Sequence, residues 1–212
     1  WFAGSSGDKA LANILFGDVN PRGKLPITFP RSEADLPHNT IVQPPPGTDP
    51  PQGPDHWRLV LEGLPAFQTT YDEGLKVGYK WYDVEKKTPL FPFGFGLSYT
   101  TYSYSDLKVT AGEHVRASFT VKNTGSRAGT EIAEVYAGLP ASTGEPPKRL
   151  VGWSRVSLAP GESKEVSVDI EPLFLSIFDT AKQGWQRTPG EYSFSVGGSS
   201  QDLPLSGRVK LN

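Results

Sequence analysis

From residue 101 onward, apolar and polar positions alternate with a period of two. The clearest run is residues 115–121, where Val, Ala, Phe and Val fill every second position. This pattern is typical of strands with one face buried and one face in water. Further runs of this kind, mostly ended by turn residues, lie at residues 131–137, 150–158, 166–170, 192–196 and 203–211.

Two shorter features complete this half of the chain. Residues 174–178 are apolar, and residues 183–186 predict a hairpin turn with a short return strand. Seven or so short strands with a turn every 8–12 residues, within about 110 residues, predict a β-sandwich. The chain has no cysteine, so the Cys–Trp–Cys pattern of antibody domains is absent and the fibronectin type III variety is favoured.

The chain before residue 100 shows a different pattern. Leu11, Ile14 and Leu15 have helical spacing and predict a helix over residues 8–16. Gly7 or Asp8 would cap its start, and Gly17 would lie just past its end. A turn at residues 18–23 and a short strand at residues 25–29 would follow.

Residues 89–100 have large apolar side chains without a helical or strand period. Pro89 and Pro92 remove backbone donors, so a central strand cannot run through them. Gly94 and Gly96 permit a positive φ or a close backbone approach between aromatic residues. We therefore predict an irregular crossing point where two domains meet.

Residues 31–70 predict an extended surface excursion. A proline-rich run at residues 44–51 excludes helix and sheet interior and favours polyproline II or turns. Trp57 follows it, and an aromatic residue on a long ordered loop often borders a binding site. The alternative is a flexible insertion with Trp57 packed against the body of the protein.

Residues 71–83 combine carboxylates, cations and three rings. Asp72 and Glu73 are adjacent, so in an extended strand they would point to opposite faces and could not act together across a scissile bond. Pairing with Lys76 or Lys80 is the expected use of these carboxylates. The rings of Tyr79, Trp81 and Tyr82 could stack on a sugar, but packing in a core or interface is favoured.

Composition narrows the function classes. The 212 residues carry a net charge of −2, with 36% hydrophobic and 21% charged residues. This balance gives no electrostatic basis for binding nucleic acid, and no run is long enough for membrane insertion. Without cysteine, and with three histidines far apart, neither a metal site nor a cofactor is indicated. The chain lacks methionine and begins with Trp1, so we expect a fragment or a processed chain.

Three long motifs, in order, resemble glycoside hydrolase family 3. Residues 10–30 read ALANILFGDVNPRGKLPITFP, residues 73–83 read EGLKVGYKWYD, and residues 91–100 read FPFGFGLSYT. Each is similar to a motif of that family, and residues 156–163 and 179–197 resemble its trailing fibronectin type III-like domain. Residues 42–70 match nothing in the family and are interpreted as an insertion.

The resemblance implies a mixed, β-rich fold. Residues 1–99 would be the C-terminal part of the family's α/β sandwich domain, with an insertion loop at about 42–70. Residues 100–212 would be a fibronectin type III-like, immunoglobulin-like β-sandwich. The preceding (β/α)8-type barrel and the rest of the α/β sandwich would be partners in the same polypeptide or in a separate chain.

The resemblance also implies retaining hydrolysis of β-linked oligosaccharides or glucosides, in the manner of a β-glucosidase. The nucleophilic Asp and the acid/base Glu would lie upstream, so no catalytic residue is assigned here and the chain alone is expected to be inert. Trp57 is the one candidate substrate-binding residue, and a periplasmic or secreted location is expected. The alternatives are a β-xylosidase or exo-glucanase of the same family, or a non-catalytic carbohydrate-binding or adhesion module built on the fibronectin-like domain.

Overall fold

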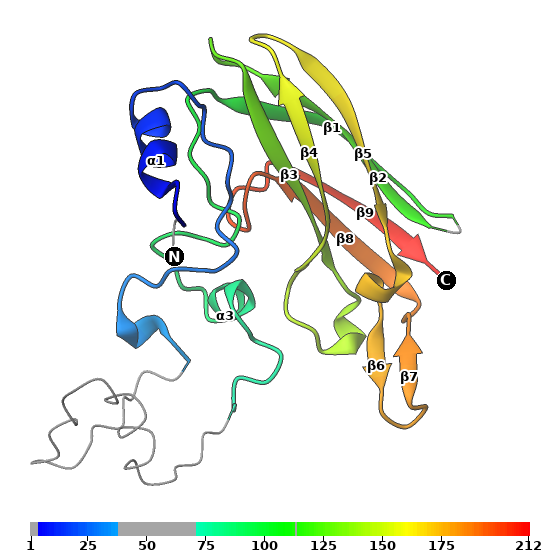
Figure 1. Cartoon of the computed structure of the whole chain (residues 1–212). Coiled ribbons are helices and arrows are strands. Elements are labelled where there is room, and N and C mark those ends of the chain that lie inside the picture. The colour runs from blue at the N-terminus through cyan, green and yellow to red at the C-terminus, as the bar shows by residue number, and fades with distance from the viewer. Residues whose placement is uncertain (1–3, 38–70, 113) are drawn as a thin grey trace, which may run out of the picture.

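The computed structural model describes residues 4–37, 71–112 and 114–212 (Figure 1). Trp57 and the predicted insertion at about 42–70 lie outside the described residues. The described part is β-rich with few helices, which confirms the predicted fold class. Its helices are α1 (Gly7–Leu15), the 3-10 turn η1 (Glu33–Asp35), α3 (Tyr79–Val84), and the 3-10 turns η2 (Ala141–Thr143) and η3 (Pro172–Leu175).

Two antiparallel sheets form the predicted sandwich. One has the order β1-β2-β5 and the other has the order β4-β3-β8-β9, with a separate β6-β7 hairpin at one end (Figure 1). The strands are β1 (Tyr102–Thr110), β2 (Val115–Asn123), β3 (Gly129–Gly138), β4 (Arg149–Leu158), β5 (Ser163–Ile170), β6 (Ile177–Asp179), β7 (Gly184–Gln186), β8 (Gly190–Gly197) and β9 (Leu205–Leu211).

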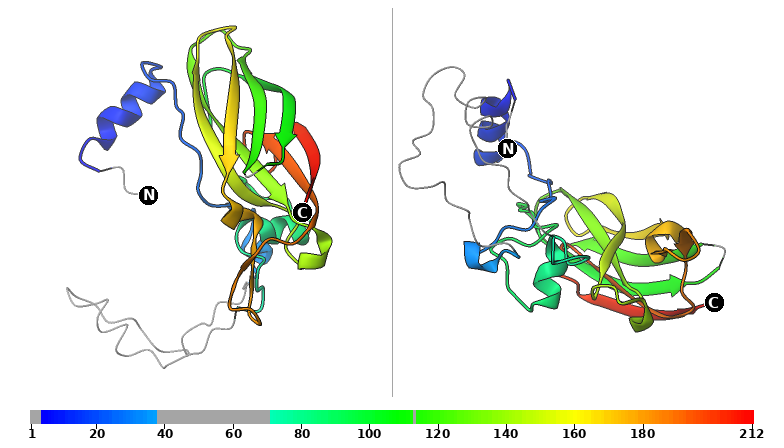
Figure 2. Two further views of the ribbon diagram at one scale, coloured as in Figure 1. Left: turned by 90° about the vertical axis from the view of Figure 1, so that its right-hand side faces the viewer. Right: turned by 90° about the horizontal axis from the view of Figure 1, so that it is seen from below.

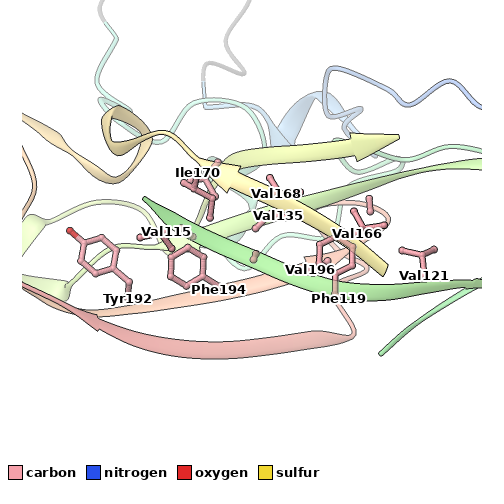
Figure 3. Close-up of a cluster of buried hydrophobic side chains, with 14 of the residues drawn as sticks. Val115, Phe119, Val121, Val135, Val166, Val168, Ile170, Tyr192, Phe194 and Val196 are labelled. Atoms are coloured by element: carbon pink, nitrogen blue, oxygen red, sulfur yellow. The ribbon is translucent and has the colours of Figure 1, made fainter. Parts of the chain in front are cut away.

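The sandwich core lies between the two sheets. Alternate residues of β2, including Val115, Phe119 and Val121, face inward and are at most 2% exposed. They meet Val135 from β3 and Phe194 from β8 in one continuous cluster (Figure 3). Burying each such side chain contributes about 1.5–3 kcal/mol, so the alternation seen in the sequence is also what stabilises the sandwich.

Helix α1 confirms the helix predicted near the N-terminus, with one difference at its start. It begins at Gly7, so Ser6 rather than Gly7 or Asp8 is the N-cap residue, although the Ser6 side chain makes no capping hydrogen bond. Gly17 follows the helix with a φ of 83°, as predicted for a residue at that position. In Figure 2 the helix stands to one side of the sandwich, joined to it by the chain that follows.

The strand predicted at residues 25–29 was wrong, because only Phe29 forms a bridge there, to Phe91. Backbone bonds join Leu25 to Phe95 and Gly94 at one end of the segment and Phe29 to Leu90 and Phe91 at the other. Pro26 has no N–H to continue a ladder between these points. The two segments therefore run together without becoming a sheet.

The extended conformation assumed for residues 71–83 was also wrong. Gly74 donates its N–H to Tyr71 O, closing a turn, and has a φ of 57°. Helix α3 then begins after Gly78, whose φ is 61°. A rule for side-chain directions in a strand therefore does not apply to Asp72 and Glu73.

The end of the chain follows the prediction closely. The apolar run at residues 174–178 divides into the end of η3 and the start of β6, and β6 pairs with β7 as the predicted hairpin. Phe178 and Trp185 are directly paired across it, with ring centroids 5.6 Å apart in an edge-to-face arrangement.

Candidate functional site

Residues 18–30 and 89–100 pack against one end and the outer face of the β4-β3-β8-β9 sheet. We call this contact the seam. In Figure 1 the two segments run between α1 and the sandwich. Backbone hydrogen bonds join them to each other, and Ser200 N–H donates to Phe93 O at 2.9 Å from the turn after β8. The irregular crossing point predicted at residues 89–100 thus forms one of the two segments of the seam.

Gly94 allows the closest approach of the two sides. Its φ is 81°, and a Cβ built on it would lie 2.6 Å from Glu134 Oε1 and closer still to Oε2. Gly96 is similarly confined, since its Cβ would lie 2.6 Å from Gly23 O. The glycines in this motif are therefore required by packing, as the sequence predicted.

Glu134 is a buried carboxylate on the sandwich side of the seam. Its residue is 5% exposed, and Tyr136 Oη donates to its Oε2 at 2.6 Å. Burial raises the pKa of Glu134 above its ordinary value, an effect opposed by the Tyr136 hydrogen bond and the charge of Lys24. Burial and the adjacent carboxylate likewise raise the pKa of Tyr136.

Lys24 inserts its ammonium group into the end of the sandwich. Its Nζ lies 3.0 Å from Glu131 Oε1 and donates to Gly198 O at 2.8 Å. Tyr104 Oη donates to the same Glu131 oxygen at 2.8 Å, and burial followed by the charge of Glu131 raises the pKa of Tyr104. The Lys24 and Glu131 side chains are only 16% and 9% exposed, so water screens this ion pair weakly.

The aromatic rings of residues 91–95 pack in two groups, and only Phe93 reaches the sandwich through other rings. Phe93 lies 5.1 Å from the ring of Tyr79, and Tyr79 meets Tyr136 of β3 edge to face at 5.7 Å. Phe91 instead packs on Phe95, at 5.0 Å, and on Phe29, on the side of the seam away from the sandwich core.

Tyr99 links α1 to the sandwich. Its hydroxyl donates to Ile14 O, and the guanidinium of Arg127 lies 5.6 Å from the centroid of its ring. Arg127 belongs to the loop between β2 and β3, so one exposed ring connects the two parts of the chain.

Helix α3 is held against the sandwich by polar contacts. Tyr79 Oη accepts the N–H of Leu150 at 2.8 Å. Asp83 pairs with Lys148 at 2.6 Å and also accepts from Gln201. The Asp83 carboxylate is 7% exposed, so its role is to fix α3 on the sandwich and it is closed to a substrate.

The three rings at residues 79–82 serve packing, which confirms the prediction favoured over sugar stacking. Tyr82 is 4% exposed. Trp81 donates its indole N–H to Asp35 O at 2.8 Å, and Lys76 and Lys87 lie over its ring.

Lys76, one of the cations expected to pair with Asp72 or Glu73, forms an ion pair with Glu85 at 2.9 Å. For Lys80, burial lowers the pKa from its ordinary value. Glu131, Glu134, Asp83 and Glu85 each have a structural partner within the described residues. None of these four is set out as an acid facing a nucleophile.

Glu131, Glu134 and Lys24 were not singled out by sequence reasoning. The only available signal for the two carboxylates was position: Glu131 and Glu134 fall inside the alternating run of β3, where a polar residue on a buried face needs a partner. The described residues hold no cluster of three His, Cys, Asp or Glu side chains suited to a metal ion. Within the same residues, no helix has the length and apolar character needed to cross a membrane.

Comparison with known proteins gives a consistent result over the whole chain. Residues 1–99 match the glycosyl hydrolase family 3 C-terminal domain, and residues 131–200 match a fibronectin type III-like domain. The "Probable beta-glucosidase K" of Emericella nidulans is 35% identical over 214 aligned residues, covering 100% of this chain and 23% of that protein.

Solved structures show the same likeness. The β-glucosidase DesR of Streptomyces venezuelae, in complex with D-glucose, superposes with a TM-score of 0.79 at 37% identity, over 97% of this chain and 25% of that one. β-glucosidase 3B of Thermotoga neapolitana, in complex with α-D-glucose, gives 0.82 at 36% identity, over 99% and 27%. The chain spans about a quarter of the length of the relatives it matches.

Proposed function

Because this chain belongs to glycosyl hydrolase family 3, we propose that it is the C-terminal portion of a retaining, exo-acting enzyme that removes terminal β-linked glucose. The observation that carries the proposal is the match to β-glucosidases along essentially the whole chain, in sequence and in fold. The chemistry would need a carboxylate nucleophile and a carboxylic acid about 5–5.5 Å apart. We propose that both lie in the upstream part of the enzyme.

The described carboxylates support this division of roles. Lys24 holds Glu131, Lys148 holds Asp83, and Tyr136 holds Glu134. These carboxylates are also buried, with at most 9% of each group exposed, so none is open to attack a substrate. The chain alone is therefore expected to be inert, and the seam to hold residues 18–30 and 89–100 in place for the longer enzyme.

One experiment tests both halves of this proposal. The longer protein should hydrolyse an aryl β-D-glucoside and release β-D-glucose first, as seen by NMR, while the 212-residue chain should release nothing. Release of α-D-glucose first, or hydrolysis by the 212-residue chain, would contradict the proposal. An aryl glycoside panel decides among β-glucosidase, β-xylosidase and exo-glucanase activity.

Helix α1 supports a partner within the same enzyme. Leu11, Leu15 and Phe16 are 58%, 68% and 84% exposed, an unusual apolar face for a helix in water. We propose that the remaining α/β sandwich covers this face, in the same polypeptide or as a separate chain. In the second case a larger partner should co-purify with the 212-residue chain.

Trp57 is proposed to line the aglycone side of the substrate site in the longer enzyme. Changing Trp57→Ala should raise KM for oligosaccharides, because an aromatic ring that stacks on a sugar is lost. Unchanged KM and kcat would show that Trp57 has no such role. A periplasmic or secreted location is also proposed, and cell fractionation tests it.

A carbohydrate-binding or adhesion module remains a second candidate. The observation that favours it is the Phe178–Trp185 pair, with the two residues 48% and 56% exposed on the β6-β7 hairpin. The mass of the natural polypeptide separates the two candidates, since the hydrolase requires an upstream catalytic region.

A further inference from the structure

A cleft of about 460 Å³ opens at the seam, between the loop at Arg22–Lys24, the start of β1 and the turn after β8. We call it the seam pocket. Its size falls within the range of about 300–1,000 Å³ that is typical of small-molecule sites. It lies on the sandwich side of the chain, and it uses none of the residues proposed above for catalysis or aglycone binding.

Four charged side chains line the seam pocket. Lys24 and the buried Glu131 are already paired with each other, and Glu131 also accepts a hydrogen bond from Tyr104. Arg22 and Asp202 also line it, and both are exposed. Neither Arg22 nor Asp202 forms an ion pair with any residue in the described ranges.

The charges of the lining disfavour ligands that carry a net charge. An anion such as a phosphate would face the carboxylates of Glu131 and Asp202, and a cation would face Arg22 and Lys24. Because Lys24 and Glu131 already neutralise each other, Arg22 and Asp202 leave one free charge of each sign, and this balance favours a molecule without net charge. Such a molecule must still both donate hydrogen bonds, to Asp202, and accept them, from Arg22.

The rest of the lining points in the same direction. Hydroxyl groups come from several elements, and the rings of Phe95 and Tyr104 supply flat apolar surface. A ring with hydroxyl groups around its edge and C–H groups on its face matches this combination. The hydroxyl-bearing residues are Ser98, Thr100, Thr101, Tyr102, Tyr104, Thr130 and Ser199. Most of these hydroxyls already bond within the protein, so a ligand would share them as additional donors or acceptors.

We propose that the seam pocket binds a neutral monosaccharide in pyranose form, at a site separate from catalysis. Asp202 would accept hydrogen bonds from adjacent sugar hydroxyls, and Arg22 would donate to a third oxygen. The sugar would bridge the loop of residues 18–30 and the turn after β8, so occupancy would tighten the seam. This holds whether or not the longer protein hydrolyses glucosides.

The test uses D-glucose and the 212-residue chain, followed by ¹H–¹⁵N NMR. Saturable shifts should appear at Gly23, Gly96 and Gly198, which line the pocket. A ligand of this size and polarity should bind with a dissociation constant on the order of millimolar. Glucose 6-phosphate and glucosamine should each bind about tenfold more weakly than glucose. The phosphate would be repelled by Asp202, and the ammonium group would be repelled by Arg22.

Two pairs of variants locate the site. Arg22→Gln and Asp202→Asn should each weaken glucose binding about tenfold, the usual loss for a hydrogen bond to a charged group. Arg208→Gln and Glu191→Gln are the matched controls, because they alter an exposed ion pair elsewhere on the sandwich and should leave binding unchanged. All four residues are exposed, so the variants should fold.

Three results would overturn the proposal. One is the absence of saturable shifts at glucose concentrations about tenfold above the expected dissociation constant. Another is an equal loss of binding in the control variants. The third is tighter binding of glucose 6-phosphate or glucosamine than of glucose. Since hydrolysis is not measured, failure here leaves the proposed β-glucosidase function intact, and the reverse also holds.

Discussion

Replacing Gly94 by alanine is the most direct test of how the seam is built. The new Cβ would lie 2.6 Å from Glu134 Oε1, inside van der Waals contact, at a backbone φ of 81°. The left-handed backbone conformation costs a non-glycine residue roughly 1–2 kcal/mol. Displacing a buried carboxylate adds an overpacking cost of about 1–3 kcal/mol. We therefore expect Gly94→Ala to lower the free energy of unfolding by about 2–5 kcal/mol.

Gly161→Ala is a matched control for this substitution. Gly161 has a φ of 75°, and a Cβ built on it would contact nothing within 4 Å. It should therefore lose only the backbone cost of roughly 1–2 kcal/mol. The difference between the two variants measures the close approach of Gly94 to Glu134.

Urea unfolding of the 212-residue chain, followed by tryptophan fluorescence and circular dichroism, gives both values. The same measurement with Glu134→Ala as the background completes a double-mutant cycle. Without the Glu134 carboxylate, Gly94→Ala should cost about as much as Gly161→Ala. The reasoning is refuted if Gly94→Ala costs no more than Gly161→Ala, or if its cost is unchanged when Glu134 is removed.

Three further predictions concern buried polar groups. Lys24→Met should destabilise the chain by about 3–5 kcal/mol at neutral pH, because it leaves the Glu131 carboxylate buried without a cation; urea unfolding measures this, and a loss below about 1 kcal/mol, the value of an exposed pair, would contradict it. Tyr79→Phe should lower the free energy of unfolding by about 1–3 kcal/mol, because Leu150 N–H loses its acceptor. Tyr82→Phe should be neutral or stabilising, because the buried Tyr82 hydroxyl has no partner among the described residues. Equal melting temperatures of the two variants would contradict this. Glu134 has a raised pKa in the folded state, so the folded state holds its proton more tightly than the unfolded state, and stability falls as pH rises from the unfolded value of 4.5 through the folded pKa. Glu134→Gln should remove that fall. The free energy of unfolding of the wild type minus that of the variant, measured by urea unfolding from pH 4 to 8, should therefore decrease as pH rises. A difference that does not change with pH would contradict the prediction.

Sequence reasoning was accurate where a single local signal decides the structure. The period-two runs located every strand of the sandwich except β1, which no predicted run covers. Side chains of a strand alternate between the core and the solvent, so a strand with one buried face is apolar at every second position. Helix α1 was found from the spacing of Leu11, Ile14 and Leu15, and Gly17 marks its end with a positive φ. The motif at residues 91–100 was correctly predicted as a close crossing of two parts of the chain.

Sequence reasoning failed where the conformation depends on contacts distant in sequence. Residues 25–29 have a strand-like composition, but Pro26 interrupts the backbone hydrogen bonds to residues 90–95, and only the Phe29–Phe91 bridge forms. Residues 71–83 are not the extended segment that the sequence suggests, because Gly74 and Gly78, both with positive φ, lead into a turn and then α3. Neither glycine reveals its φ from the sequence alone.

By itself, the sequence determined the β-sandwich, the family resemblance and the position of the seam. The β-sandwich follows from the period-two alternation of its strands, the crossing at residues 89–100 follows from its prolines and glycines, and the family resemblance rests on the three motifs. Only the tertiary structure showed that Lys24 reaches Glu131 across 107 positions, and that Glu134 lies under Gly94. It alone also brought Arg22 and Asp202 to one pocket. The reason is that charge pairing and close packing depend on which side chains the fold brings together, and side chains far apart in sequence carry no local sign of that meeting.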